Sequence, residues 1–454
     1  MPRFSLKSNR RIDMVNGPLL SKLALFAVPI VISGLLQLLF NAADIAVVGR
    51  YTGSSALAAV SASGPISSLI VTLFMGLSIG ANVLCAQLIG ARRYNDLYEA
   101  IHTSIAISVG IGIAMMIVGL IFAGPLLSVL GTPEAILPLA KKYLIIYFIG
   151  VPSTMIYNFG AAILRAFGDT KRPLYYLTLS GVLNVILNLF FVIVVGMGVE
   201  GVAAATVISQ TLAAALVIIT MIRSDDVYHL DIKALKIYKE KLITLVKIGL
   251  PAGIQSSCFS VSNLLIQSAV NSFGETVMAA STVALNIDAF CAVAIDALSQ
   301  AAISFTGQNY GAKNFKRIDR IFAYTLGIGC FLALLFGVTA YHFAPQLLSI
   351  YTHDPAVIEI GVDIMFIVCI FCFINCTMNI PFNVVRGMNR SLFPMISTIL
   401  CVCVLRVIWI YTIFAKYHTL TVLFTSWPFT KGVASITGLI YFFWLRKRIR
   451  KEAA

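Results

Sequence analysis

The stretch QLIGAR at residues 87–92 returns as QNYGAK at residues 308–313, 221 positions later in the chain. Other residues recur with an offset of 221 or 222: Arg165 and Arg386, Pro173 and Pro394, Pro29 and Pro251. Around both copies, long apolar segments alternate with short polar ones. We therefore expect the chain to consist of two related halves.

Apolar segments fill most of the 454-residue chain, which is 59% hydrophobic and 11% charged. Soluble proteins carry about 25% charged residues, and a membrane-spanning helix needs about 20 apolar ones. Twelve segments are long enough: 21–48, 56–89, 101–123, 137–163, 173–197, 200–222, 243–271, 277–307, 321–343, 356–383, 392–415 and 424–445. With six spans each, both halves enter the membrane in the same direction, as parallel repeats do. The sequence predicts an all-α integral membrane protein with 12 transmembrane helices in two pseudo-symmetric six-helix bundles.

The positive charge of the chain, +14 at pH 7, is distributed unevenly. Of the 33 Lys and Arg residues, 27 fall in segments that share the cytoplasmic side if the N-terminus is cytoplasmic. Because cytoplasmic segments of membrane proteins are enriched in Lys and Arg, we expect both termini inside and the protein in the cytoplasmic (inner) membrane. The charge then reflects topology and contact with membrane lipids, which argues against nucleic acid as a partner.

The repeat and the polar segments divide the chain into two lobes. Residues 1–222 form the predicted N-lobe and residues 243–454 the C-lobe, joined by a cytoplasmic linker at 223–242. Two six-helix lobes with a site between them suit a transporter that works by rocking. Because the sequence contains neither a Walker loop nor an ATP-binding domain, an ion gradient is the energy source that remains.

Three predicted helices of the N-lobe carry polar residues at overlapping depth in the outer half of the membrane. Helix by helix, they are Ser33, Gln37, Asn41 and Asp44; Asn184 and Asn188; Thr206 and Gln210. Residues three or four apart share a helix face, so we interpret the set as the lining of a hydrated, outward-facing cavity. The alternative interpretation is that the amides and hydroxyls only join helices through hydrogen bonds.

Asp44 is the one acidic group of this predicted cavity. Ionisable side chains at membrane depth are costly and are functional candidates by default. No basic residue of the N-lobe membrane interior is available as its structural partner. Asp44 could exchange a proton, or could bind Na+ together with oxygens of Asn184 and Thr206.

The C-lobe carries a different polar set. Asn263 corresponds to Asn41 of the first half, and the acids inside the predicted span 277–307 are Asp288 and Asp296. At a rise of about 1.5 Å per residue, Asp288 and Arg406 lie at matching depths. We expect a buried ion pair between them, and we expect Asp296 to lie too deep to share it.

Two of the predicted helices carry prolines at repeated positions, and a third carries a set of asparagines. Pro29 and Pro251 lie inside predicted spans, where a proline removes a backbone hydrogen bond and kinks the helix. The kinks either give the helices a fixed shape or serve as hinges. In the span 356–383, Asn379 belongs to a set of asparagines four residues apart around Pro381, which either line the central cleft or satisfy the interruption of the helix.

Several stretches resemble the multidrug and toxic compound extrusion (MATE) family of transporters, and the resemblance covers essentially the whole chain. The stretches are DIAVVGR at 44–50, GSSALAAV at 53–60, NVILN at 184–188, QNYGA at 308–312 and FGAAILRAFGDTKRP at 159–173. The resemblance implies an antiporter, driven by H+ or Na+, that exports cationic amphipathic compounds, and a pair of six-helix bundles of the MATE/MOP fold.

Within that family, the chain looks closer to the DinF-like branch than to the NorM-like branch. In the DinF-like branch, an Asp that follows a Pro by 15 residues binds the coupling ion, as Asp44 follows Pro29 here. The rest of that cluster would correspond to Asn184, Asn188, Thr206 and Gln210. Asn188 replaces a second acid of the family pattern, so the resemblance favours a proton over sodium.

Two other classes of function remain as alternatives. A lipid-linked oligosaccharide flippase of the same superfamily would use several bases in its cavity, whereas we identify Arg406 as the mid-span base. A membrane enzyme would need clustered His or acidic residues, and the five His lie near predicted membrane edges or loops. We expect a monomeric transporter with no cofactor, no resident metal and no enzymatic activity.

Overall fold

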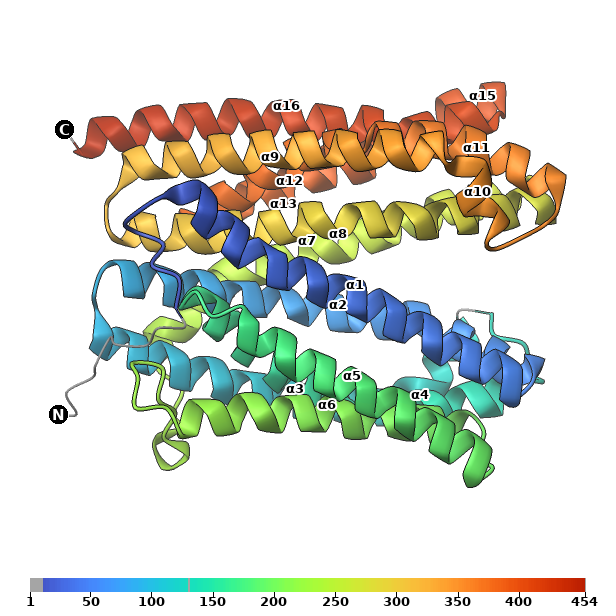
Figure 1. Cartoon of the computed structure of the whole chain (residues 1–454), viewed down its shortest axis with the longest axis horizontal. Coiled ribbons are helices and arrows are strands. Elements are labelled where there is room, and N and C mark those ends of the chain that lie inside the picture. Colours follow the sequence, from blue (N-terminus) through green and yellow to red (C-terminus); the bar gives the residue numbers. More distant parts are fainter. Residues whose placement is uncertain (1–10, 130, 454) are drawn as a thin grey trace. The chain divides into compact units, whose positions relative to one another are not determined.

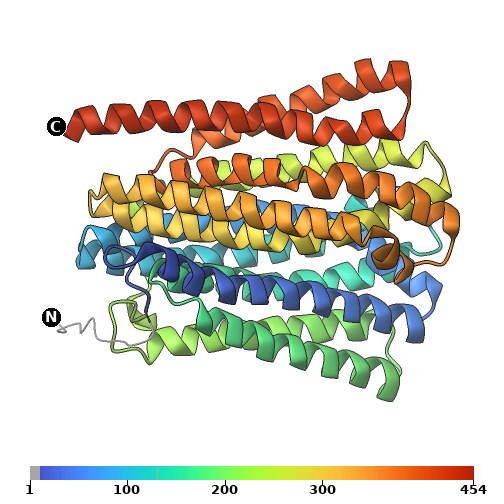
Figure 2. The same cartoon turned by 45° about the horizontal axis from the view of Figure 1, so that its top comes forward.

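The computed structural model describes residues 11–129 and 131–453, and this part of the chain is helical, without β-strands. Figures 1 and 2 show long helices joined by short turns. In the first half they are α1 (Leu19–Tyr51), α2 (Ser54–Gly90), α3 (Tyr94–Val129), α4 (Leu137–Ala166), α5 (Lys171–Leu189), η1 (Phe190–Val194), α6 (Val199–Ile222) and η2 (Ile232–Ala234). In the second half they are α7 (Lys239–Asn271), α8 (Glu275–Gly311), α9 (Phe315–His342), α10 (Ala344–Ser349), α11 (Pro355–Ile370), α12 (Cys372–Gly387), α13 (Leu392–Thr398), η3 (Ile399–Val404), α14 (Leu405–Trp409), η4 (Ile410–Phe414), α15 (Ala415–Tyr417) and α16 (Leu420–Ala453).

The helices confirm the predicted all-α membrane fold. Eleven spans among the described residues are long and apolar enough to cross a membrane. Three of these spans are assembled from consecutive helical segments, at 171–194, 355–387 and 392–417. The remaining long helix, α16, corresponds to the twelfth predicted span. It is less apolar because it carries Lys431 and a basic end.

Contacts between residues divide the chain into two compact units. Among the described residues, unit 1 consists of residues 11–13, 32–129 and 131–253, and unit 2 of residues 14–31 and 254–453. The chain therefore changes unit inside α1 and again inside α7. The two changes occur at positions 222 residues apart, each just after the proline of its helix, Pro29 or Pro251. The division by contacts thus differs from the division by sequence, because each repeat begins with a helix whose first part belongs to the other unit.

In unit 1, α4 packs against α2, α3 and α6. Glycines allow this packing: a Cβ at Gly112 would come within 2.5 Å of Pro152, and one at Gly119 within 2.0 Å of the Phe148 ring. Phe148 is 1% exposed and belongs to an apolar cluster that also includes residues of α1, α2 and α6. The core of unit 1 therefore fixes the positions of the helices that carry the N-lobe polar residues.

The first part of α7 meets α2 at a crossing of four glycines. Gly76 and Gly80 lie one turn apart on α2, and Gly249 and Gly253 lie one turn apart on α7. A Cβ at Gly253 would lie 2.0 Å from the backbone oxygen of Leu73, and a Cβ at Gly76 would lie 2.1 Å from the backbone nitrogen of Gly253. Small residues at four-residue spacing let helix backbones approach closely in membranes. The sequence contained this signal, which our sequence analysis did not use.

In unit 2, α8 packs against α9, α11 and α12, and α12 also packs against α9 and α16. The first part of α1 joins this unit, because the rings of Phe26 and Phe305 meet edge to face at 5.5 Å. Ala27 shares an apolar cluster with Ala297 and Leu298 of α8.

The interruption of the tenth predicted span lies elsewhere than we expected. Pro381 lies inside α12, which continues through it. The helix is instead broken at Phe371, between α11 and α12. The prediction that Pro381 interrupts the helix is therefore wrong, although a proline inside a helix still removes one backbone hydrogen bond.

Candidate functional site

The carboxylate of Asp44 begins a chain of hydrogen bonds through three helices of unit 1. Its Oδ1 accepts a hydrogen bond from Nδ2 of Asn188 on α5. The same Nδ2 lies 3.3 Å from Oδ1 of Asn184, one turn earlier. Nδ2 of Asn184 in turn donates to Oγ1 of Thr206 on α6, at 3.4 Å. The polar faces of α1, α5 and α6 therefore meet, as the residue spacing predicted.

The amides of this chain are inaccessible, whereas the carboxylate is less so. Asn188 is fully buried and Asn184 is 6% exposed, while Asp44 is half-buried. Oδ1 of Asn188 is buried and has no hydrogen-bond partner among the described residues. A buried acceptor without a partner costs free energy. Beside Asp44, it could accept a hydrogen bond or contact a cation.

Phe40 holds α1 against α5 one turn before Asp44. Its ring fills the space beside Gly181, where an added Cβ would lie 1.9 Å from the nearest ring carbon. Gly181 precedes Asn184 by three residues, so this contact lies directly beside the hydrogen-bond chain. Gly181 is not among the residues predicted from the sequence, because the packing role of a helical glycine becomes visible only when its neighbour is known.

Four other predicted N-lobe residues stay outside the chain of hydrogen bonds that begins at Asp44. The side chains of Gln37 and Asn41 are exposed on α1, and Gln210 is half-buried on α6, one turn from Thr206. Ser33 is half-buried on α1. These residues remain candidates for the lining of a cavity rather than parts of the bonded chain.

Tyr143 of α4 is the aromatic neighbour of Asp44. It lies within electrostatic range of the carboxylate and stacks on Tyr147 at 6.3 Å between ring centroids. Both rings pack against the apolar cluster of unit 1. Tyr143 is therefore both part of the core of unit 1 and an electrostatic neighbour of Asp44.

Asp44 forms no ion pair within the part of the chain that the structure describes. In the same unit, Glu200 at the start of α6 pairs with Lys142 of α4, with 3.2 Å between nitrogen and oxygen. That pair satisfies the acid nearest in sequence to Thr206. Asp44 is thus a membrane carboxylate without a compensating base among the described residues.

Unit 2 places its charges differently from our prediction. Arg406 is 1% exposed, and its Nη1 donates to Oγ of Ser262 at 2.8 Å and to Oδ1 of Asn263 at 3.1 Å. No ion pair joins Arg406 to Asp288 in the described chain, so the predicted pair is wrong. Arg406 lies in α14 between two π-helical segments, η3 and η4, and π-turns shift the face on which the following side chains lie. A depth calculation for a regular helix does not include such a shift.

Lys431 of α16 supplies the basic group near the acids of unit 2. It interacts electrostatically with both Asp288 and Asp296, and its Nζ lies 5.5 Å from the ring centroid of Trp427. Asp288 also accepts a hydrogen bond from the thiol of Cys372. Arg406 was the only mid-span base that we predicted; the position of Lys431 inside the predicted span 424–445 was the available signal for a second one.

The asparagines of α12 have local partners. Nδ2 of Asn379 donates to Oδ1 of Asn375 at 3.2 Å. Oδ1 of Asn383 accepts a hydrogen bond from Nη1 of Arg386 at 2.6 Å. Neither contact shows a ligand site. Among the described residues, no group of three or more His, Cys, Asp or Glu side chains could hold a metal ion, and all nine cysteines are free.

Comparison with known proteins adds an independent line of argument. The MatE family model matches the chain twice, at residues 29–190 and 251–412. The "Probable multidrug resistance protein YpnP" of Bacillus subtilis is 28% identical over 433 residues, which cover 95% of this chain and 94% of that protein. The "Multidrug export protein MepA" of Staphylococcus aureus is 23% identical over 360 residues, covering 79% of this chain and 80% of that protein.

A solved structure shows the same fold. It is described as the outward-facing conformation of a multidrug resistance MATE family transporter of the MOP superfamily. It matches with a TM-score of 0.91 and 24% identity, covering 98% of this chain and 100% of that one.

The two family matches together cover more than half of the chain, and they begin at the repeated prolines Pro29 and Pro251. Members of this family are transporters and not enzymes, which confirms the expectation that the protein has no enzymatic activity. The chain therefore belongs to the MATE family of multi-pass membrane transporters, whose members similar to it include multidrug efflux proteins.

Proposed function

We propose that the protein is a secondary active antiporter that exports cationic amphipathic compounds in exchange for protons by alternating access. The observation that carries this proposal is Asp44, a half-buried membrane carboxylate that is bonded to Asn188 and has no base paired with it among the described residues. The multidrug efflux proteins among its relatives support the class of substrate.

The coupling requires that a proton and a cationic compound compete for one carboxylate. In its charged form, Asp44 attracts a cation; in its protonated form, it is neutral and releases one. Removing the charge also weakens the charge-assisted hydrogen bond from Asn188. Since Asn188 belongs to α5 and Asp44 to α1, protonation changes the contact between these helices.

Sodium is the alternative coupling ion, with Asp44, Asn184 and Thr206 as its expected ligands. In the structure, Oδ1 of Asn184 is near Nδ2 of Asn188, and Oγ1 of Thr206 accepts from Asn184 and donates to the backbone oxygen of Val202 at 3.0 Å. The ligand oxygens are therefore engaged with protein donors. With a single carboxylate present, this arrangement favours a proton over Na+.

The prolines of α1 and α7 are suitable hinges for alternating access. Pro29 and Pro251 each lie just before the position where their helix passes from one unit to the other. A bend at that position would allow the two parts of each helix to move with different units. We therefore favour the hinge interpretation of these prolines over that of static kinks.

The proposed topology places both termini in the cytoplasm and the protein in the cytoplasmic membrane. Its support is the distribution of Lys and Arg along the sequence. The proposed partners are small cationic substrates, the coupling proton and membrane lipids, and the transporter acts as a monomer.

The ion is tested with purified protein in sealed vesicles loaded with a cationic fluorescent dye. We expect an imposed proton gradient to drive dye transport, and a sodium gradient at constant pH to drive little. Vesicles with a protonophore serve as the control for the first condition. Transport that follows the sodium gradient alone would contradict the proton mechanism but leave the efflux function in place.

A second prediction concerns the amide of Asn188. Asn188→Asp would place a second carboxylate beside Asp44 and supply the charge that a Na+ site lacks. Because two close carboxylates repel each other unless a cation or proton is bound, we expect dye transport by the variant to become stimulated by sodium. Transport at graded sodium concentrations and constant pH measures this. Asn188→Ala is the control, and an equal sodium response in both variants would show that the carboxylate is not responsible.

The flippase alternative is less well supported. Lys431 adds a second base to Arg406 in unit 2, which at first favours an anionic cargo. However, Lys431 interacts electrostatically with Asp288 and Asp296, so its positive charge is already compensated. Arg406 is likewise occupied by hydrogen bonds to unit 2 side chains.

A further inference from the structure

One exposed face of α16 is apolar along its middle part and becomes basic toward the C-terminal end of the helix. Its exposed apolar residues Ile436, Ile440 and Phe443 are 59%, 65% and 51% exposed. Continuing at helical spacing, Lys447 and Lys451 are exposed as well. Residues spaced three and four apart lie on one face of a helix. This face is therefore a continuous stripe with a hydrocarbon part and a cationic part.

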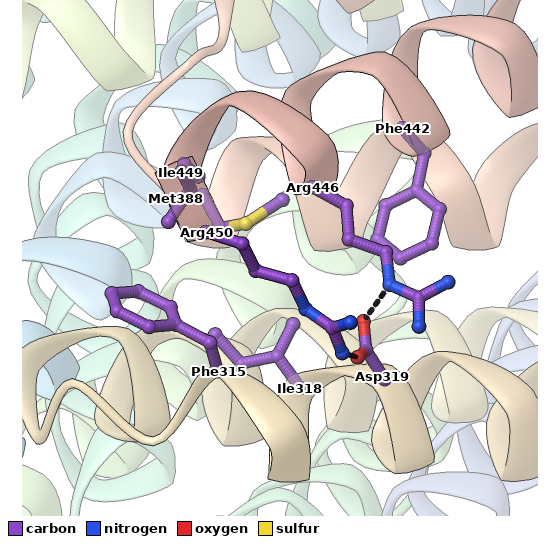
Figure 3. A pocket seen from close by; sticks show the side chains of 8 residues that line it. All are labelled: Phe315, Ile318, Asp319, Met388, Phe442, Arg446, Ile449 and Arg450. Carbon is purple, nitrogen blue, oxygen red and sulfur yellow. Dashed lines mark hydrogen bonds and ion pairs between the residues drawn. The ribbon is translucent and has the colours of Figure 1, made fainter. Parts of the chain in front are cut away.

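Two arginines beside the cationic part are held in place by one acid. Asp319 of α9 contacts Nε of Arg446 with its Oδ1 at 2.8 Å, and its Oδ2 contacts Nη2 of Arg450. Figure 3 shows both guanidinium groups reaching down from α16 to the carboxylate. Below them, Phe315 and Ile318 of α9 lie close to Ile449. The contact fixes the last turns of α16 on α9, so the basic side chains project from a supported helix.

The basic side chains and Phe443 flank an open groove along one face of α16. Its volume is about 510 Å³, and it is lined by Phe443, Arg446, Lys447, Arg450 and Lys451 of this helix alone. Four of these five residues are cationic, and Asp319 compensates one of the four charges. A net charge of about three positive units remains around a groove whose apolar end is Phe443.

The first half of the chain lacks this feature, so the repeat itself does not require it. With the offset of 222, the positions of the four cationic residues correspond to Ser224, Asp225, Tyr228 and His229 at and beyond the end of α6. The basic groove is thus a property of α16 alone. It lies at the end of a helix whose exposed face is apolar at Ile436, Ile440 and Phe443.

We propose that this groove binds an anionic phospholipid. The phosphate contacts Lys447, Lys451 and the free edges of the two arginines, while one acyl chain lies along Phe443, Ile440 and Ile436. Basic residues near a membrane attract anionic lipids, and the apolar stripe, about 10 Å long along the helix, offers a contact for the part of the acyl chain nearest the headgroup. A second copy of the protein is a poor occupant, because it would bring two cationic grooves together.

The test measures lipid binding with purified full-length protein in neutral detergent, independently of transport. Dioleoylphosphatidylglycerol is titrated and followed by native mass spectrometry and by the apparent melting temperature, with dioleoylphosphatidylcholine in parallel. We expect the anionic lipid to bind and to raise the melting temperature, and the zwitterionic lipid to do neither. In Lys447→Gln/Lys451→Gln, which spares the contacts of Asp319, we expect binding to weaken roughly 30-fold, since each base contributes roughly a factor of five.

Three controls make the result specific. Lys447→Arg/Lys451→Arg should retain binding because it keeps the charge, and Lys233→Gln/Lys236→Gln should retain it because it removes two exposed lysines of the linker instead. sn-Glycerol 3-phosphate separates a lipid from a free phosphate, and we expect it to have no effect. Equal binding of both lipids, an unchanged affinity in the glutamine variant, saturation by glycerol phosphate, or a lipid-independent dimer would each overturn the proposal.

Discussion

Asp44→Asn is expected to abolish proton-driven dye efflux while leaving the protein folded. The amide keeps the size of the side chain and can still bond with Asn188, but it carries no charge and binds no proton in this pH range. A cation about 4 Å from a carboxylate gains about 4 kcal/mol at an effective dielectric constant of about 20. Even a third of this energy corresponds to about tenfold in affinity. We therefore expect transport to fall at least about tenfold and its dependence on the proton gradient to disappear.

The measurement compares the initial rates of dye transport in vesicles containing equal amounts of folded protein, at several imposed pH gradients. Asp225→Asn is the matched control, because it makes the same chemical change at an exposed position in the linker. Its transport should equal that of the unchanged protein. If Asp44→Asn transported dye at the control rate with the same response to pH, the coupling role of Asp44 would be refuted.

The arrangement around Asp44 could be predicted from the sequence because it depends on regular helices. Asn184 and Asn188 are one turn apart on α5, and Thr206 lies on the next helix, so their spacing alone predicted that they would face Asp44. The structure brings these four residues into one chain of hydrogen bonds. The spacing could not predict which group donates in each hydrogen bond. It also could not predict that the ring of Phe40 packs on Gly181.

The charges of unit 2 could not be predicted in the same way, because local irregularities determine their neighbours. The π-helical segments on both sides of Arg406 change the face on which this side chain lies, and they leave no pattern in the sequence. The break at Phe371 likewise involves neither glycine nor proline. Lys431 is different: its position in a predicted span was visible, and only its proximity to Asp288 and Asp296 required the structure.

Unit 1 and unit 2 consequently differ in how their membrane charges are compensated. Asp288 and Asp296 of unit 2 have a base, Lys431, within electrostatic range, whereas Asp44 has a hydrogen-bond donor, Asn188, instead. A compensated acid gains little by binding a proton or a cation, because either one adds a positive charge beside Lys431. This difference supports the proposal that coupling resides in the first half, although the two halves share their architecture.

The largest expected effect on stability comes from Gly253→Ala at the glycine crossing of α2 and α7. The new Cβ would lie 2.0 Å from the backbone oxygen of Leu73. Because this is a backbone atom, no side-chain rotation can remove the clash. The helices would have to separate, and overpacking of this kind costs about 1–3 kcal/mol. We expect a clear fall in the apparent melting temperature of the purified protein and a lower yield of folded protein.

Gly110→Ala is the matched control, because Gly110 also lies inside a helix, is exposed, and has nothing within 4 Å of the added Cβ. An alanine there is expected to leave the melting temperature unchanged or to raise it, since glycine is less favourable than alanine in a helix by about 0.5–1 kcal/mol. Similar melting temperatures for the two variants would show that the helices at the crossing can separate at little cost in stability.

Gly253 also bears on function, because it is the last residue of unit 1 within α7. Weaker packing at the crossing would free the part of α7 that now packs against α2. A loss of transport beyond the loss of folded protein would therefore indicate that alternating access needs this part of α7 fixed to unit 1.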